Sequence, residues 1–139
     1  MTAAPTRCIV ADDHPALLVA VTGYLAESGL DVVGQAQDGA AAVALAEREQ
    51  PDLAVVDYRM PRADGAELVR ALKAVSPHTR VAVYTAEADE AVVDEALRAG
   101  AAAVVLKDAP LADLVRALEW IARDRPYVDA AITLGSLRA

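Results

Sequence analysis

Five polar side chains stand where short apolar runs of the sequence end. Asp12 and Asp13 follow the first run, Asp57 follows a later one, and Thr85 and Lys107 come at the ends of the last two. Three carboxylates within a few ångströms would repel one another strongly even at an effective dielectric constant of about 20. A divalent cation removes that repulsion, and Mg²⁺ suits such a site because it takes few carboxylates and keeps several waters. Positions left open on the ion could bind a phosphoryl oxygen.

The elements that would gather these residues are short β-branched runs that alternate with longer helical patterns. That alternation is typical of a parallel sheet built from β-α-β units. Loops beyond the carboxyl ends of such strands form the ligand crevice, so the five polar residues belong to one rim. The predicted strands are apolar enough for burial on both faces: Cys8–Ala11, Val32–Ala36, Leu53–Val56, Val81–Tyr84 and Ala103–Leu106.

Apolar residues at helical spacing predict a helix in each connection. Pro15 suits the first turn of one helix, and the pairs Asp38-Gly39 and Asp64-Gly65 suit the starts of the next two. The last two helices carry apolar stripes made of Val92, Val93, Ala96 and Leu97, and of Leu111, Leu114, Val115, Leu118, Ile121 and Ala122.

Composition restricts the class of protein further. A chain of 139 residues with 55% hydrophobic and 24% charged residues suits one globular domain. Its net charge of −8 argues against nucleic-acid binding by this chain itself. No apolar stretch approaches the ~20 residues of a membrane helix, the start lacks a secretory signal, and the lone Cys8 cannot form an internal disulfide. These features predict a cytoplasmic protein without membrane contact.

In their order along the chain, these motifs resemble the receiver domains of two-component response regulators, from about residue 7 to residue 123. The resemblance rests on four motifs: Asp12-Asp13, Asp57-Tyr58-Arg59-Met60-Pro61 with Asp64-Gly65, Thr85-Ala86, and Lys107. It implies an α/β fold of the flavodoxin-like, doubly wound (βα)5 type, a three-layer sandwich whose five-stranded parallel sheet has the order 2-1-3-4-5.

Three further stretches resemble the NarL/FixJ branch of that family: DDHP at 12–15, LKDAP at 106–110 and RPYVD at 125–129. Members of this branch usually append a LuxR-type helix-turn-helix, and transcription would be regulated through it. No such domain lies in these 139 residues, so DNA would be bound only by an output domain outside this chain. We expect a receiver domain over residues 1–124 and the start of a linker or a C-terminal tail over 125–139.

The resemblance implies that Asp57 is the nucleophile that takes a phosphoryl group from the phosphohistidine of a sensor histidine kinase. Asp13, Asp57 and the backbone carbonyl of Arg59 would bind Mg²⁺. Asp12 would orient the metal through a water or a hydrogen bond. The domain would catalyse only its own phosphorylation and dephosphorylation and would not otherwise be an enzyme.

The resemblance also implies that Lys107 and the hydroxyl of Thr85 contact the phosphoryl oxygens, while the small Ala86 leaves them room. Movement of Thr85 would carry its loop with it and give a two-state switch. Each residue also has a simpler interpretation: Asp12 as a helix cap, Lys107 as a solvated loop residue, Thr85 as an ordinary strand residue. We expect His14 to face solvent near the site without a role.

One position departs from the family pattern. Receivers commonly carry Tyr or Phe three residues before the lysine, where Val104 stands here, and a valine is too small and stiff to act as a moving aromatic. Tyr84 cannot replace it, because it neighbours Thr85 on a strand and points to the opposite face. The alternative function is therefore a phosphorylation-independent receiver that acts as a protein-interaction or dimerisation module.

Two other classes fit the site chemistry less well. Metal-dependent phosphatases with an aspartate nucleophile need an acid two residues after it, where Arg59 stands. Nucleotide-binding flavodoxin-like modules need a glycine-rich loop after the first strand, where the two acids would repel a phosphate.

Trp120, the only tryptophan, projects away from the apolar stripe of the last helix. Its ring could rest on the stems of Arg116 and Arg123. A large surface aromatic is also a typical interface anchor, so we favour a homodimer or output-domain contact through this helix. The tail could instead fold over the ring through its apolar residues: Tyr127, Val128, Ile132 and Leu134.

Overall fold

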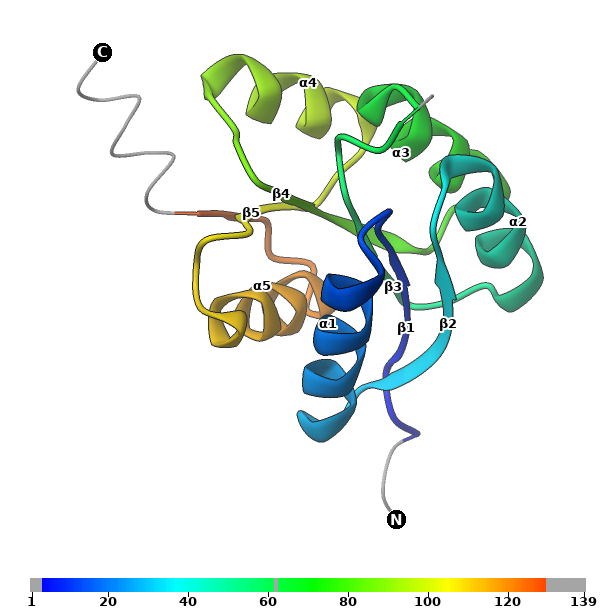
Figure 1. The fold of residues 1–139 in the computed structure, drawn as a ribbon. Coiled ribbons are helices and arrows are strands. Elements are labelled where there is room, and N and C mark those ends of the chain that lie inside the picture. The colour runs from blue at the N-terminus through cyan, green and yellow to red at the C-terminus, as the bar shows by residue number, and fades with distance from the viewer. Residues whose placement is uncertain (1–3, 62, 130–139) are drawn as a thin grey trace.

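The computed structural model describes residues 4–61 and 63–129, which form a parallel sheet between two layers of helices (Figure 1). The described residues give six strands in the order β2-β1-β3-β4-β5-β6, and every neighbouring pair is parallel. The expected flavodoxin-like fold with the order 2-1-3-4-5 is confirmed, and a two-residue strand extends it at one edge. The strands are β1 (Arg7–Ala11), β2 (Asp31–Ala36), β3 (Leu53–Val56), β4 (Arg80–Thr85), β5 (Ala103–Leu106) and β6 (Tyr127–Val128).

The helices of the described residues cover both faces of this sheet. Figure 1 shows α1 and α5 on one face and α2, α3 and α4 on the other. None of these helices is long and apolar enough to cross a membrane. Their bounds are α1 (Pro15–Glu27), α2 (Gly39–Glu49), α3 (Gly65–Val75), α4 (Glu90–Ala99) and α5 (Leu111–Ala122).

Alternating strand residues divide the core into two apolar clusters, because successive side chains of a strand point to opposite faces. In β3, Ala54 and Val56 belong to the cluster beneath α2, α3 and α4, whereas Val55 belongs to the cluster beneath α1 and α5. Val104 lies in the first cluster and Tyr84 in the second. The expectation that Tyr84 points away from the face of Val104 is thus confirmed.

Three helices begin at an aspartate that caps the first turn. Asp38, Asp64 and Asp89 accept hydrogen bonds from backbone amides three residues later, at 2.8, 3.1 and 2.9 Å. Each such cap stabilises a helix by about 1 kcal/mol. In contrast, α1 begins after His14, whose side chain makes no capping bond. Asp12 is therefore not the cap of α1, and its carboxylate is available to the site.

The pairing of β2 with β1 shifts once. Val32 and Gly34 pair with successive residues of β1, so Val33 is passed over. A Cβ at Gly34 would lie 2.6 Å from Cδ1 of Leu45, so any larger residue here would force the Leu45 side chain of α2 to move.

After α5 the chain returns to the sheet as β6. Tyr127 and Val128 pair with β5, and the amide of Asp129 donates to the carbonyl of Val104 at 3.0 Å. These residues belong to the segment that the sequence predicts as a linker or tail. Its described part is therefore packed against the domain.

Trp120 lies beside this returning segment and is 43% exposed. Its ring makes an edge contact with Tyr127, with centroids 6.2 Å apart, and Arg125 lies over it at 5.7 Å. The cation on the ring is thus Arg125, whereas helical spacing had indicated Arg116 and Arg123. The predicted packing of the tail against the ring is present at Tyr127. Two further residues expected to take part, Ile132 and Leu134, lie outside the described residues.

The buried face of α5 is rotated from the predicted one. Ala117 is buried together with Leu114, Leu118 and Ile121, while Ala122 is exposed. The small side chain of Ala117 lets the helix approach the sheet closely on that side, which the spacing of large apolar residues does not reveal.

Candidate functional site

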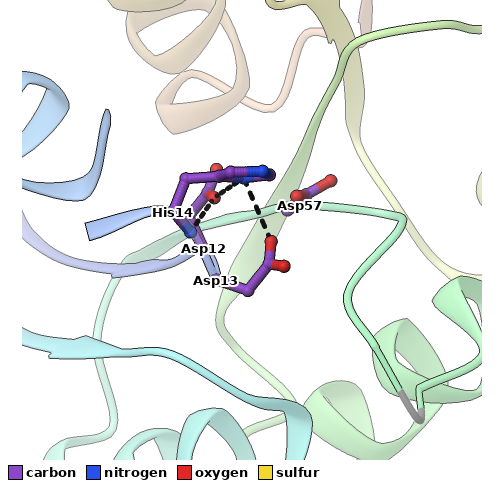
Figure 2. Close-up of side chains that lie close together, drawn as sticks. All are labelled: Asp12, Asp13, His14 and Asp57. Atoms are coloured by element: carbon purple, nitrogen blue, oxygen red, sulfur yellow. Dashed lines mark hydrogen bonds and ion pairs between the residues drawn. The ribbon is translucent and has the colours of Figure 1, made fainter. Parts of the chain in front are cut away.

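Four side chains that can bind a metal gather at the carboxyl ends of β1 and β3 (Figure 2): Asp12, Asp13, His14 and Asp57. One ligand atom from each lies within 4.8 Å of the others. Asp12 and Asp57 are only 3% and 4% exposed, so little water screens their charges. The structure therefore brings together the three carboxylates that the sequence marks as site residues.

Backbone hydrogen bonds continue past the strand ends and fix these acids in place. The amide of Asp57 donates to the carbonyl of Ala11, and the amide of Asp12 donates to that of Ala36, both at 3.0 Å. Since β1 lies between β2 and β3, Asp12 and Asp57 leave neighbouring strands at the same rim. The positions of the carboxylates are thus set by the sheet rather than by a flexible loop.

Lys107 reaches the acidic cluster from the end of β5. Its Nζ lies 2.7 Å from Oδ2 of Asp12 and 3.0 Å from Oδ2 of Asp57. The ring centroid of Tyr84 is 6.0 Å from the same nitrogen. The Lys107 side chain is 13% exposed, which excludes the interpretation that it is a solvated loop residue.

The charges of this cluster are coupled. Burial alone would lower the pKa of the Lys107 ammonium, but its hydrogen bonds to Asp12 and Asp57 raise that pKa above the ordinary value. Burial alone would raise the pKa of Asp12, but the hydrogen bonds from Lys107 and from the backbone and ring of His14 hold it below the ordinary value. Lys107 and Asp12 are therefore an ion pair at neutral pH.

His14 contacts the cluster, which the sequence did not predict. Its side chain is 66% exposed, as expected for a residue facing solvent, yet Nδ1 lies 3.0 Å from Oδ1 of Asp12 and 3.2 Å from Oδ1 of Asp13. The amide of His14 also donates to Oδ1 of Asp12 at 2.9 Å. A signal for this turn exists in the sequence, because an aspartate often accepts a hydrogen bond from the backbone amide two residues later.

Asp13 provides an observation that bears on metal binding. Its Oδ1 is buried but makes no hydrogen bond within the described part of the chain, although the ring of His14 is near. A buried carboxylate oxygen without a donor is costly unless a cation lies beside it. The carboxylate oxygens of Asp12, Asp13 and Asp57 are the kind of donor that Mg²⁺ prefers, so these three acids fit that ion.

Thr85 and Arg59 complete the set of predicted site residues. Thr85 is fully buried at the end of β4, and its hydroxyl donates to the carbonyl of Glu87 in the following loop at 3.1 Å. Arg59 is exposed, and its amide donates to Oδ1 of Asp57 at 3.0 Å. The loop after β3 therefore holds the Asp57 carboxylate by one oxygen, while Lys107 holds it by the other.

Comparison with known proteins adds the family context. A family model described as the response regulator receiver domain matches residues 8–119. A curated relative from Mycobacterium tuberculosis (strain ATCC 25618 / H37Rv), "Probable transcriptional regulatory protein NarL", is 40% identical over 130 residues, which are 93% of this chain and 60% of the relative. Response regulator GacA of Pseudomonas aeruginosa is 32% identical over 127 residues, which are 91% of this chain and 59% of the relative. This chain thus spans about 60% of the length of these relatives.

Solved structures agree with the sequence comparison. The NarL signal receiver domain from Mycobacterium tuberculosis superposes with a TM-score of 0.83 at 39% identity, covering 88% of this chain and 100% of that one. A LuxR-family two-component response regulator from Aurantimonas sp. SI85-9A1 superposes with a TM-score of 0.85 at 28% identity, covering 97% of both chains. The second of these likenesses extends over nearly the whole chain.

Proposed function

Since this chain belongs to the response regulator receiver domains, in their NarL/FixJ branch, we propose that it accepts a phosphoryl group on Asp57 from a sensor histidine kinase. The observation that carries this proposal is the position of the Asp57 carboxylate. It is buried beside the two other acids and is held by Lys107 at 3.0 Å. A purely structural ion pair needs one acid for each ammonium, whereas here three acids gather beside one lysine.

Mg²⁺ is the cofactor that this proposal requires. Asp13, Asp57 and the backbone carbonyl of Arg59 would hold the ion, and Asp12 would act through a water or a hydrogen bond. The unsatisfied Oδ1 of Asp13 supports this choice. When bound, the ion would offset negative charge on the acids and on the transferred phosphoryl group.

The transfer itself uses the side chains of this chain. One carboxylate oxygen of Asp57 attacks the phosphorus of the kinase phosphohistidine. The new O–P bond forms as the P–N bond breaks, and the imidazole nitrogen keeps the electron pair. Lys107, already directed at Asp57, offsets the charge on the phosphoryl oxygens. Thr85 exchanges its bond to the Glu87 carbonyl for one to a phosphoryl oxygen, and the loop after β4 moves with it.

The phosphorylation-independent alternative is less well supported. An interaction module without phosphoryl chemistry would have no use for buried acids that repel one another around a lysine. Val104, which motivated that alternative, is fully buried in the core and leaves the acidic cluster intact. The lack of an aromatic side chain at position 104 therefore bears on how the domain passes on its signal, and not on the phosphoryl site.

The activity of the whole protein is proposed from the relatives, which are longer than this chain. We propose that the phosphorylated domain regulates transcription in the cytoplasm through a LuxR-type output domain that lies outside these 139 residues. We further propose that it forms a homodimer through the face of α5 that carries Trp120. The partial exposure of this ring supports that choice.

Incubation with a small phosphodonor and Mg²⁺ tests the proposal directly. Intact-mass measurement should show one added phosphoryl group on the wild-type chain and none on Asp57→Asn. Asp108→Asn, a change of an exposed acid near the site, is the matched control and should accept the group normally. No adduct on the wild type with metal present would refute the proposal.

A further inference from the structure

The residue next to the phospho-acceptor is bonded to a distant helix. Tyr58 is 8% exposed, and its hydroxyl donates to Oε1 of Glu95, which is 37 positions further along the chain in the middle of α4. A hydrogen bond from a phenol to a carboxylate is stronger than one between neutral groups.

The Tyr58 ring is also held at the start of α3. A Cβ on Gly65 would lie 2.5 Å from Cγ and Cδ1 of the ring and from the carbonyl oxygen of Tyr58. Only a glycine leaves room for this contact. Tyr58 thus lies between α3 and α4, the two helices that Figure 1 shows side by side on one face of the sheet.

The backbone of Tyr58 belongs to the phosphoryl site. Asp57 precedes it, and the amide of Arg59 after it donates to Oδ1 of Asp57. A change at the Asp57 carboxylate would break the hydrogen bond from the Arg59 amide. The backbone before and after Tyr58 would then shift. The side chain of Tyr58 would carry that change toward α4.

Helix α4 is held on the sheet by few buried side chains, so a single hydrogen bond can affect its position. Only Ala96 and Ala99 are buried in this helix, whereas α5 buries two leucines and an isoleucine. Next to the Tyr58–Glu95 bond lies an open hollow of about 560 Å³, lined in part by Val92 of α4. A helix with little buried apolar surface and space beside it moves at low free-energy cost.

We infer that Tyr58 is a positioning residue that couples the state of Asp57 to the placement of α4 through its hydrogen bond to Glu95. Tyr58 is the one aromatic side chain in the described part of the apolar cluster that also contains Val104. The inference rests on the proposed phosphorylation of Asp57. Because such coupling is reciprocal, the bond also links the position of α4 to the geometry of the acceptor loop.

Hydrogen–deuterium exchange of residues 90–99, with and without beryllofluoride and Mg²⁺, tests this coupling. Beryllofluoride is a non-covalent stand-in for the phosphoryl group, and its binding is measured separately by titration. In the wild type, exchange in α4 should change by about fivefold or more on binding, the lower end of common coupling strengths. In Tyr58→Phe, which keeps the ring, beryllofluoride should still bind while the response of α4 is much smaller than in the wild type, because only the route through Thr85 and the loop after β4 remains.

Further variants separate the hydrogen bond from general packing. Glu95→Ala changes an exposed side chain and should reproduce the loss, whereas Glu95→Gln keeps an acceptor oxygen and should retain the response. Tyr24→Phe removes a phenol hydroxyl from α1 and should behave as wild type. An α4 response in Tyr58→Phe equal to that of the wild type, or no response in the wild type with beryllofluoride bound, would overturn the inference alone. Failure of the wild type to bind beryllofluoride would overturn the proposed function as well.

Discussion

Nζ of Lys107 lies 2.7 Å from Oδ2 of Asp12, closer than to Asp57. The lysine is thus anchored mainly by an acid other than Asp57, the proposed phospho-acceptor. Because Asp12 also holds Lys107, the lysine should keep its place when phosphorylation changes the charge on Asp57. The predictions below start from this ion pair and from the acids around it.

Lys107→Ala should destabilise the metal-free domain by about 3 kcal/mol, because it leaves two buried carboxylates without their cation. The same change should tighten Mg²⁺ binding, since the local negative charge increases. Urea denaturation with EDTA and with Mg²⁺ measures both effects. A variant as stable as the wild type in EDTA would show that the ion pair contributes nothing net.

Asp13→Ala should have the opposite effect on the metal-free protein. Removing one of three repelling acids, whose Oδ1 has no hydrogen bond in the described chain, should add about 1 kcal/mol, or roughly 3 °C in Tm. The stabilisation by Mg²⁺ expected for the wild type should be absent from this variant, because the ion loses a ligand. Calorimetry of this variant and of Glu119→Gln, an exposed acid far along α5, distinguishes the site from general charge. A lower Tm for Asp13→Ala in EDTA would contradict the repulsion argument.

Cys8 should make stability fall at alkaline pH. Burial raises the pKa of its thiol from 9.0 to about 12. At pH values between these two pKa values, the thiol of the unfolded chain loses its proton while that of the folded chain keeps it. The free energy of unfolding therefore decreases as pH rises. The loss is at most about 1.4 kcal/mol per pH unit.

Cys8→Ala provides the reference for this effect, since every other titrating group is retained. The free energy of unfolding of the wild type should fall more steeply than that of the variant between pH 9 and pH 12. Thiol alkylation of the native protein should also be slow across this range. Parallel pH profiles for the two proteins would mean that Cys8 ionises as in the unfolded chain.

Trp120→Ala should weaken self-association without affecting phosphorylation of Asp57. The variant loses an exposed aromatic of the kind that anchors interfaces, and it also loses the edge contact with Tyr127, worth about 1 kcal/mol of folding stability. Sedimentation with and without phosphodonor measures association. Tyr127→Ala is the control, because it breaks the same ring contact but leaves Trp120 in place.

Equal sedimentation of Trp120→Ala and the wild type in both phosphorylation states would remove the dimer proposal. Weakening by Tyr127→Ala to the same degree would show that the packed segment, and not the indole surface, supports association.

The strands and the rim were predictable because the signals are local. Runs such as Leu53–Val56 are apolar throughout and end in a charged residue, which identifies both the buried strand and the end that faces the site. The aspartates before α2 and α3 likewise marked helix starts by their type and position. Proximity of Asp12 to Asp57 then followed from the rule that parallel strands share one rim.

Contacts that depend on tertiary placement could not be predicted. β6 has only two residues, too few to show a period of two, and Tyr127 reads equally well as part of a linker. The bond from Tyr58 to Glu95 joins segments whose distance apart is set by how α4 lies on the sheet. By contrast, the contact of the His14 ring with Asp12 and Asp13 is local, and its signal in the sequence was missed.

The two edges of the sheet are protected against pairing with other chains by different means. At one edge, β6 pairs with Ala103 and Val104 and so occupies hydrogen-bonding groups that this half of β5 would otherwise offer to a passing strand. At the other, the irregular pairing around Val33 interrupts the flat template that edge-to-edge association needs. A mutation that detaches β6 should therefore expose backbone hydrogen-bonding groups of β5. Its first effect should be slow, concentration-dependent aggregation while the domain is still folded.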